Sequence, residues 1–309
     1  MTLPSAASRE LYGTVQVFEP HRASLPPMGP YLRELWRRRR FAYELSRTTQ
    51  KAANSDAKLG SLWLVLNPLL LAAVYYLLIE VISQRSGGLP AFLHIVIGLF
   101  TWYFIAGCVS VGASSVTAGG KLILNQSFPR ALLPLSSVIS AWLRFLPTVP
   151  VYLFLYGLGL LLVSASSGPN GLVRPTWALL WYPVVMCILA VSGFGLAMIF
   201  ATLMVYFRDT NKFLSYMMRI WLYLTPVLFT AEALKLKFDH IIVFGMHLGN
   251  VMIYCNPLGP AFGAMGNIWD KGIPPSPAML IAAVFWAVVT LIGGAYIFIS
   301  RERDFAVRL

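Results

Sequence analysis

The stretch "TWALLWYPVVMCILAVSGFGLAMIFATLMVYF", residues 176–207, decides the fold class, because it contains no charged side chain. About 20 apolar residues are enough for a helix to cross the hydrocarbon core of a membrane. This stretch exceeds that minimum, which allows the helix to tilt. Further apolar stretches lie at about 61–79, 89–118, 145–165, 213–231 and 278–300. The sequence therefore predicts an all-α polytopic membrane protein with six transmembrane helices.

The composition agrees with this fold class. Hydrophobic residues make up 58% of the chain and charged residues 12%, whereas soluble domains carry about 25% charged residues. The first 59 residues hold no apolar run of the kind that a secretory signal requires. We expect a cytoplasmic N-terminal region over residues 1–59 and a six-span transmembrane domain over residues 60–309.

The distribution of basic residues predicts the orientation. Six spans place both termini on one side, together with the connections at 119–144 and 207–219. That side holds all but five of the 24 Lys and Arg residues. The five on the other side are Arg85, Arg174, Lys235, Lys237 and Lys271. Since Lys and Arg concentrate in cytoplasmic loops, both termini are predicted to be cytoplasmic.

The spans carry no ionisable residue at their midpoints. Ion-coupled carriers usually need such residues inside the membrane, so a secondary transporter is disfavoured. The chain also lacks an ATP site of its own. The nearest segment to a phosphate loop, "VTAGGKLIL" (116–124), has neither the first Gly nor the Ser or Thr after Lys. We therefore expect no cofactor in this chain and an energy source elsewhere.

The segment "GPYLRELWRRRRFAYELSRTTQKA", residues 29–52, combines apolar residues at helical spacing with a run of arginines. It predicts a basic amphipathic helix on the inner leaflet. Its candidate interface residues are Trp36, Arg37, Arg38, Arg39 and Arg40. The helix is either a lipid anchor and topology signal or a docking surface for a cytoplasmic partner. Nucleic acid is not expected as a partner, because the neighbouring spans hold this segment at the membrane.

Residues 232–277, on the opposite side, contain two apolar stretches at 241–255 and 256–269. Each is too short to cross, and such lengths are typical of re-entrant or interfacial segments. The Asn256-Pro257 step predicts a turn between them. We expect re-entrant gate helices before the last span, with a simple amphipathic loop as the alternative.

The connection "LNQSFPRALLPLS", residues 124–136, predicts a short interfacial helix that runs from Pro129 to about Arg144. Proline is tolerated in the first turn of a helix, and Asn125 or Ser127 could cap it. Phe128 and Arg130 are expected to project, exposed, at its start. Such a projection suits a contact with a cytoplasmic partner.

Together these features resemble a known family. "AKLGSLWLVLNPLL" (57–70) resembles the signature at the first span of polysaccharide-exporting type-2 ABC permeases. "NQSFPRALLPLSSVIS" (125–140) resembles their segment after the second span. "VYFRDTNKFLSYMMRIWLYLTPVLF" (205–229) and "CNPLGP" (255–260) resemble their later elements. The matches come in family order and cover most of residues 30–300. The motifs are similar to those of exporters of O-antigen, teichoic acid and actinobacterial cell-wall galactan.

The resemblance implies a homodimer in the bacterial cytoplasmic membrane, with two copies of a separate ATPase that binds ATP and Mg. It implies that the dimer conducts a lipid-linked polysaccharide in contact with membrane lipids. Spans one and five face the dimer axis in the family, so the candidate conduit residues are Trp63, Tyr75, Tyr76, Trp221 and Tyr223. The implied ATPase-coupling residues are Phe128, Pro129, Arg130, Arg208 and Asp209. Asn256 and Pro257 mark the gate. Arg208 and Asp209 could instead cap a helix end.

A polytopic glycosyltransferase is the alternative from another class. It would place acidic residues at the extracytoplasmic ends of spans, where Glu80, Glu232, Asp239 and Asp270 are available. These residues form no paired Asp motif. We expect no metal site, because the His residues show no ligand spacing.

Overall fold

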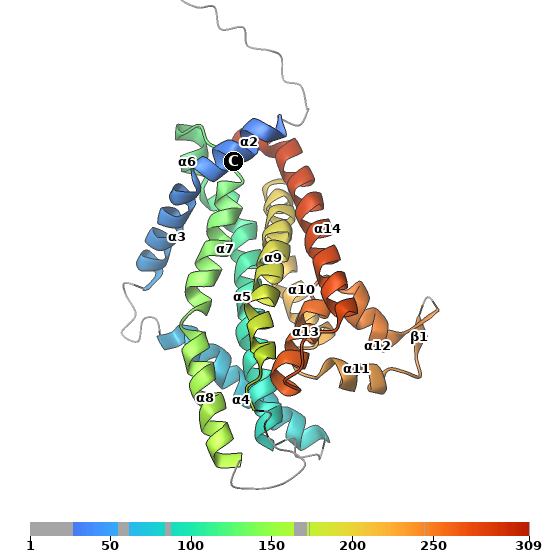
Figure 1. Cartoon of the computed structure of the whole chain (residues 1–309). Helices are drawn as coiled ribbons and strands as arrows, with labels where there is room; N and C mark the ends of the chain where they lie inside the picture. Colours follow the sequence, from blue (N-terminus) through green and yellow to red (C-terminus); the bar gives the residue numbers. More distant parts are fainter. Residues whose placement is uncertain are drawn as a thin grey trace, which may run out of the picture.

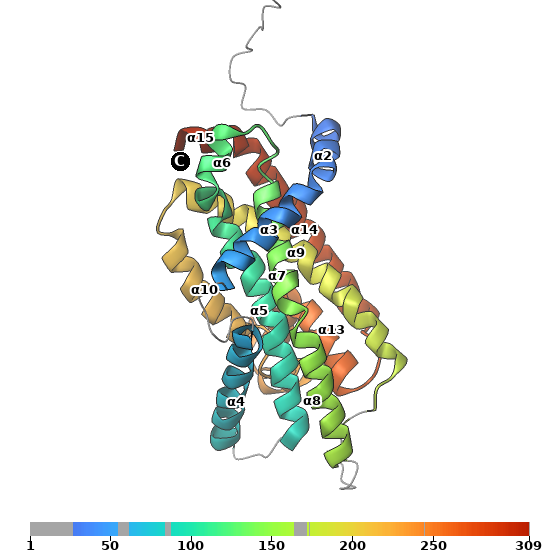
Figure 2. The same cartoon turned by 90° about the vertical axis from the view of Figure 1, so that its left-hand side faces the viewer.

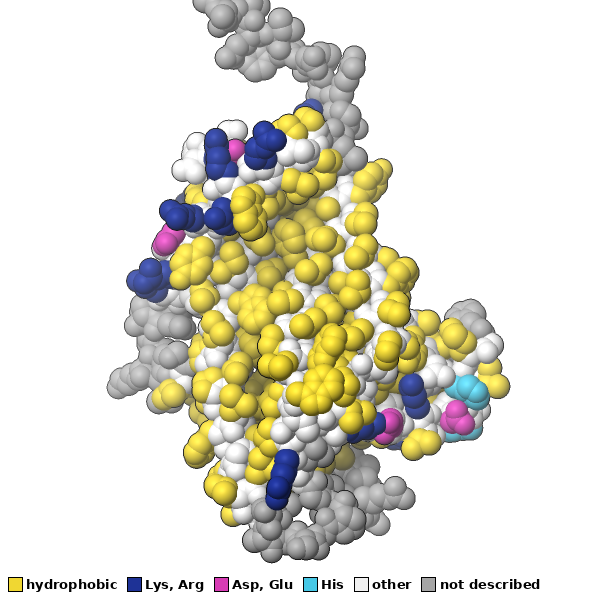
Figure 3. Space-filling view, viewed as in Figure 1, with side chains coloured by type: hydrophobic (Ala, Val, Ile, Leu, Met, Phe, Trp, Pro, Cys, Tyr) yellow, Lys and Arg dark blue, Asp and Glu magenta, His cyan; other side chains and the backbone are white. Residues whose placement is uncertain are grey.

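The protein is an elongated bundle of helices arranged around α5 (Gly88–Ala118) (Figure 1). The computed structural model describes residues 27–54, 62–83, 88–163, 172, 174–243 and 245–308. One end of the bundle carries α2 (Met28–Arg37), α6 (Gly120–Asn125), η4 (Glu302–Asp304) and α15 (Phe305–Arg308). We call it the basic end, because Lys and Arg gather there, whereas hydrophobic side chains cover the middle of the molecule (Figure 3).

Within the described residues, four helical stretches are long and apolar enough to cross a membrane. They are Gly88–Ala118, Leu132–Leu162, Trp177–Tyr206 and Pro277–Arg308. The second of these stretches joins α7 (Leu132–Phe145) to α8 (Thr148–Val163), and the third joins η2 (Trp177–Leu180) to α9 (Trp181–Tyr206). The prediction of an all-α polytopic membrane protein is confirmed at this level.

The predicted ends of the second, fourth and sixth spans lie close to the observed ends. Local capping explains the start of two of them. The Thr176 hydroxyl accepts a hydrogen bond of 3.3 Å from the Ala178 backbone N–H, at the start of η2. Ser276 accepts an equivalent bond of 3.3 Å from Met279 at the start of α14 (Pro277–Arg301). Both caps satisfy backbone donors that a helix start leaves unpaired.

The first and fifth predicted spans are shorter than the others. The apolar part of α4 (Trp63–Ser83) ends at Ile79, and α10 (Thr210–Leu224) has 15 residues. Helix α10 stops because Thr225 precedes Pro226 and adopts an extended backbone, with φ −105° and ψ 145°. In Figure 2, α10 lies beside the upper half of the bundle and α4 beside the lower half.

The predicted helix from Pro129 to about Arg144 corresponds to α7, which packs within the bundle. Helix α7 packs against α5 and is followed, after a two-residue turn, by α8, and together the two form one stretch long and apolar enough to cross a membrane. Its serines gave the segment a polar character, but they are satisfied inside the bundle. Ser136 donates to the Leu133 carbonyl (2.7 Å), Ser137 to the Pro134 carbonyl (2.6 Å) and Ser140 to the Ser46 hydroxyl (2.9 Å).

The predicted basic amphipathic helix is two helices, because it breaks at Arg38 between α2 and α3 (Arg39–Asn54). Helix α3 lies along α7 (Figure 2). The Gln50 side chain donates to the Ser140 carbonyl (3.2 Å), and Ala42 and Ser46 are buried at the contact. No residue of helix α2 is fully buried, and Tyr31 is partly buried.

The region after α10 contains a small hairpin that the sequence did not predict. Helix α11 (Ala231–Lys237) is followed by strands β1 (Ile242–Val243) and β2 (Met246–His247), which pair antiparallel. Helix α12 (Leu248–Asn250) and the π-helical turn η3 (Val251–Cys255) then lead to α13 (Gly259–Asp270). The expected turn is confirmed at Asn256-Pro257, which lies between η3 and α13.

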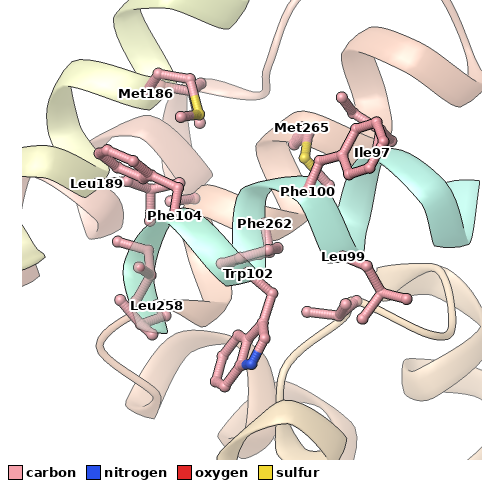
Figure 4. Packing of buried hydrophobic residues seen from close by; sticks show 14 of the residues in the cluster. Ile97, Leu99, Phe100, Trp102, Phe104, Met186, Leu189, Leu258, Phe262 and Met265 are labelled. Carbon is pink, nitrogen blue, oxygen red and sulfur yellow. The ribbon is translucent and has the colours of Figure 1, made fainter. Parts of the chain in front are cut away.

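The core is built around α5, whose side chains are buried on several faces. Figure 4 shows Phe100, Trp102 and Phe104 of α5 packed among residues of other helices. The residues that meet them include Met186 and Leu189 of α9, Leu258, and Phe262 and Met265 of α13. The core therefore fixes the position of α13, which the sequence had placed in the gate region.

Candidate functional site

Glu302 ties three separate segments together at the basic end. Its carboxylate accepts one hydrogen bond from the backbone N–H of Arg130 (2.5 Å) and another from the Tyr31 hydroxyl (2.7 Å). The Arg130 guanidinium also donates to the Glu302 backbone carbonyl. The start of α7, helix α2 and the end of α14 are thus joined through one acidic residue. We call these three residues the Glu302 clamp.

Burial shapes the titration of the clamp. Burial, followed by the nearby Glu302 charge, raises the pKa of Tyr31. Burial lowers the pKa of Arg130, and the charge of Glu302 opposes that effect. Because the pKa of Tyr31 is raised from a value near 10, its hydroxyl keeps its proton at neutral pH and donates to Glu302.

Phe128 and Arg130 are half-buried, so the expectation that they project freely is wrong. The Phe128 ring packs against Phe41 of α3, with 5.4 Å between the ring centroids. Arg38 donates to the carbonyl of Ser127 (2.9 Å), and Pro129 is buried. Phe128 and Arg130 thus contact residues of this chain, Phe41 on α3 and Glu302 on η4, that are distant in sequence. The tertiary fold brings these segments together.

Arg208 and Asp209 lie in the exposed connection between α9 and α10. Asp209 is the residue that precedes α10, but its side chain makes no capping hydrogen bond. Asp209 therefore occupies the N-cap position of α10, in agreement with the alternative that it caps a helix end, but without a side-chain hydrogen bond. In Figure 2 this connection lies toward the same end of the bundle as α6 and α15.

The arginines at the break between α2 and α3 form an exposed basic surface. Glu34 pairs with Arg37 (3.1 Å) and with Arg38 (2.5 Å). Arg39 lies over the ring of Trp36, 4.5 Å from its centroid, and that ring is 68% exposed. Arg40 is also exposed. An exposed Trp beside several Arg residues is typical of a surface that meets anionic lipid headgroups.

Two of the conduit candidates meet each other. The hydroxyls of Tyr75 on α4 and Tyr223 on α10 lie 3.2 Å apart, and their rings pack edge to face with centroids 6.2 Å apart. Trp63 is 42% exposed and lines a cavity of about 350 Å³ between α4, α5 and α7. Tyr76 instead packs against Phe92, with 5.5 Å between the centroids. The structure thus joins Tyr75 and Tyr223 on one face, with Trp63 beside a cavity on α4.

Trp221 is joined to the gate turn. Its indole N–H donates to the Asn256 side-chain carbonyl (2.7 Å). The Asn256 amide donates to the Leu224 carbonyl (3.2 Å) and to the Thr225 hydroxyl (3.0 Å). One asparagine therefore fastens the turn before α13 to the end of α10. Pro257, next to it, is half-buried.

We expect Asn256→Leu to lower the free energy of unfolding in detergent by about 2 kcal/mol. The substitution leaves the Trp221 N–H and the end of α10 without their partner, and an unsatisfied buried group costs about 1–3 kcal/mol. Thermal unfolding followed by tryptophan fluorescence measures this change. Asn211→Leu, at an exposed position on α10, is the matched control. Equal transition temperatures for the two variants would contradict this role of Asn256.

Sequence reasoning missed the pair formed by His94 and Asp270. Nδ1 of His94, on α5, lies 2.8 Å from an Asp270 carboxylate oxygen at the end of α13. The His94 side chain is 6% exposed and that of Asp270 is 23% exposed. The residues are 176 positions apart, so no local spacing could have indicated the contact. Glu302 was missed for the same reason.

Three of the acidic residues considered for a glycosyltransferase pair with basic residues, and the side chain of Glu80 lies outside the described residues. Glu232 pairs with Lys271, Asp239 with His247 (3.3 Å) and Asp270 with His94. In the part of the chain that the structure describes, no group of three or more His, Cys, Asp or Glu residues could hold a metal ion. Each of these carboxylates is thus engaged with a different basic residue, and Glu232 and Asp270 line the same cavity.

Comparison with known proteins identifies relatives over most of the chain. No family model matches. Two similar proteins from Klebsiella pneumoniae are each called O-antigen export system permease protein RfbA. One is 31% identical over 199 residues, which cover 63% of this chain and 70% of the relative. The other is 28% identical over 261 residues, which cover 83% of this chain and 90% of the relative. A protein of the same name from Myxococcus xanthus is 29% identical over 278 residues, 89% of this chain and 97% of the relative.

Proposed function

The chain belongs to the family of O-antigen export system permeases, and from this premise we propose that it is the pathway for a lipid-linked polysaccharide. It is a non-catalytic transmembrane subunit of an ABC polysaccharide exporter, and the ATPase is a separate subunit. The observation that carries the proposal is the 31% identity to a named permease across 70% of its length. An O-antigen-like glycan is the substrate class that this relative suggests, and a cell-wall galactan is a narrower alternative.

We propose that two copies of the chain assemble around the glycan. In addition to the four long apolar stretches, six crossings per copy require α4 and α10 to serve as the first and fifth spans. These helices expose large apolar side chains together with the Tyr75–Tyr223 contact. The exposed apolar residues are Leu70, Val74, Leu77 and Leu78 on α4 and Phe213, Tyr216 and Ile220 on α10. Aromatic rings offer apolar faces to a sugar, and their hydroxyls tolerate water, which supports a conduit at this face.

The basic end is proposed to face the cytoplasm and two copies of the ATPase, which bind ATP and Mg. The exposed arginines of α2 and α3 support this orientation, because basic residues concentrate on the cytoplasmic side. Movement of the ATPase would reach α7 and α14 through the Glu302 clamp and through Phe128. Residues 1–59 are then a cytoplasmic region, and residues 60–309 form the transmembrane domain.

The segment from α12 to α13 is proposed to act as a re-entrant gate at the opposite end. The Asn256-Pro257 turn and the short lengths of its arms support this function. Irregular backbone at membrane depth is tolerated where protein buries it, and the contacts of Trp221 and Phe262 supply such burial.

The function is tested in cells that lack the chromosomal copy of the gene. These cells should lose the surface glycan, and the chain should restore it while co-purifying with an ABC ATPase. Tyr223→Ala should slow export at least about threefold at equal expression, because it removes an aromatic face from the conduit. Glycan release into the outer layer, followed by pulse labelling, measures the rate.

Tyr296→Ala is the control, because Tyr296 is 62% exposed but lies on α14. Equal export by the Tyr223→Ala and Tyr296→Ala variants would remove Tyr223 from the conduit. A surface glycan that persists without the gene would overturn the proposed function as a whole.

A further inference from the structure

A cavity of about 220 Å³ opens beside the His94–Asp270 pair, toward the end of the bundle opposite the basic end. Helices α5, α8 and α13 contribute to it. The aromatic and charged residues that line it are His94, Tyr152, Tyr156, Trp269 and Asp270. Pockets for drug-sized ligands occupy about 300–1,000 Å³. The smaller volume suits a single ring-sized group.

A second cavity, of about 290 Å³, lies on the other side of Asp270. The two cavities share Thr230 and Asp270 in their walls. The second is the more polar of the two. Its polar lining includes Glu232, Lys235, Asn267, Lys271 and Ser276. Asp270 therefore lies where two adjacent cavities meet.

Buried polar atoms beside the first cavity lack a partner among the described residues. The indole Nε1 of Trp269 is buried without a hydrogen bond. Nε2 of His94 is also buried without a hydrogen bond. Buried polar groups are nearly always hydrogen-bonded. Both atoms are closed to solvent, so they do not face the open volume of the cavity.

The aromatic residues hold the site in a fixed shape. The Trp269 ring packs edge to face against Tyr152, Tyr156 and Tyr182, with centroid distances of 4.7, 5.5 and 5.4 Å. Asp270 follows Trp269 directly at the end of α13. A rigid support of this kind reduces the entropy that is lost when a ligand binds.

The charges around the two cavities disfavour an anionic ligand. The Lys271 ammonium is paired with Glu232, and the Lys235 ammonium lies over the Tyr254 ring, 5.1 Å from its centroid. Asp270 adds a carboxylate at the junction. Phosphate recognition normally relies on unpaired Arg or Lys, or on a cradle of backbone N–H groups. Hydroxyl groups, by contrast, are suited to carboxylate and amide partners.

We propose that the cavities meeting at Asp270 form a binding subsite for one or two neutral sugar residues of the exported glycan. The proposal rests on the proposed export function. The site is distinct from the conduit candidates, because Tyr75 and Tyr223 belong to α4 and α10. The first cavity is lined by α5, α8 and α13, and the second by α11, α13 and α14. In Figure 2, α4 and α10 lie on one side of the bundle and α8 and α13 on the other.

Direct binding tests the subsite without requiring export. The full chain, in lipid nanodiscs, is titrated by saturation-transfer NMR with methyl α-glycosides of glucose, galactose, mannose and rhamnose. The oligosaccharide that mild acid releases from the cells' own surface glycan is an additional probe. Inorganic phosphate is titrated separately. Two variants address the site: Asp270→Asn, which keeps the size of the side chain, and Ala91→Trp, which fills the first cavity from its half-buried wall.

We expect at least one sugar probe to bind with a millimolar Kd and phosphate to show no saturable binding. Asp270→Asn and Ala91→Trp should each weaken sugar binding at least about tenfold, whereas Tyr296→Ala should leave it unchanged. Because Ala91→Trp leaves the buried pair intact, it serves as the test if Asp270→Asn fails to fold. Absence of sugar binding, equal binding by Ala91→Trp, or a preference for phosphate would overturn the subsite. Normal export by a chain that binds no sugar probe would overturn the subsite alone and leave the proposed function standing.

Discussion

Export of the glycan is expected to fall at least about tenfold when Arg130 is replaced by glutamate and Phe128 by alanine, while the chain still inserts into the membrane. Arg130→Glu removes the guanidinium bond to Glu302 and places two carboxylates side by side. Phe128→Ala removes the ring that packs against Phe41. Truncating a well-packed anchor residue costs about 2 kcal/mol or more. Helix α7 would then be uncoupled from α2, α3 and α14.

Lys121→Glu is the matched control, because it makes the same change of charge at an exposed position on α6 at the same end. Surface glycan and the amount of co-purified ATPase are measured together for each variant. Loss of export with the ATPase still bound indicates a break in transmission, and loss of the ATPase indicates a direct contact. Export by the double variant at the rate of Lys121→Glu would rule out a coupling function for this segment.

Replacement of Gly195 by valine is expected to prevent accumulation of the folded protein. A Cβ atom at Gly195 would lie 2.3 Å from the backbone carbon and oxygen of Thr290 on α14. A Cβ atom at Gly294 would in turn lie 2.2 Å from the Gly195 carbonyl. In membranes, small residues allow helix backbones to approach closely and so to pack against each other. Backbone atoms have no rotamer to adopt, so α9 and α14 would have to separate, which we expect to cost more than about 4 kcal/mol.

Gly293→Val provides the comparison, because a Cβ atom at Gly293 meets nothing within 4 Å. Gly293 and Gly294 are neighbours on α14, but only Gly294 faces α9. Fluorescence-detected size-exclusion chromatography of detergent extracts reports the folded fraction. A symmetric peak of normal height for Gly195→Val would show that the contact between α9 and α14 does not limit folding.

Helix ends were predictable where local chemistry fixes them. Thr176 and Ser276 cap the helices that follow them. The apolar stretch after each cap can be recognised without knowledge of the tertiary structure. The start of α7 was not predictable in the same way. The sequence shows serines and prolines, which suit a helix at the membrane surface. Only the packing of α7 against α5 and α3 shows that these serines are satisfied internally.

The candidate site divides along the same line. Motif order placed Phe128, Arg130, Trp221 and Asn256 in functional segments before any contact was known. The sequence held no sign that Trp221 donates to Asn256, or that Tyr75 meets Tyr223. Those contacts join residues 35 and 148 positions apart. Hydrophobic periodicity and turn signals are properties of neighbouring residues and do not extend over such separations.

The sequence by itself determined that this is a multi-pass helical membrane protein, because long uncharged apolar stretches have no other stable arrangement in water or lipid. It also determined the family, because the motifs depend on residue identity and order. Only the tertiary structure decided that Glu302 holds Arg130 and Tyr31, and that His94 meets Asp270. A buried polar group needs a partner, and the fold alone settles which distant residue provides it.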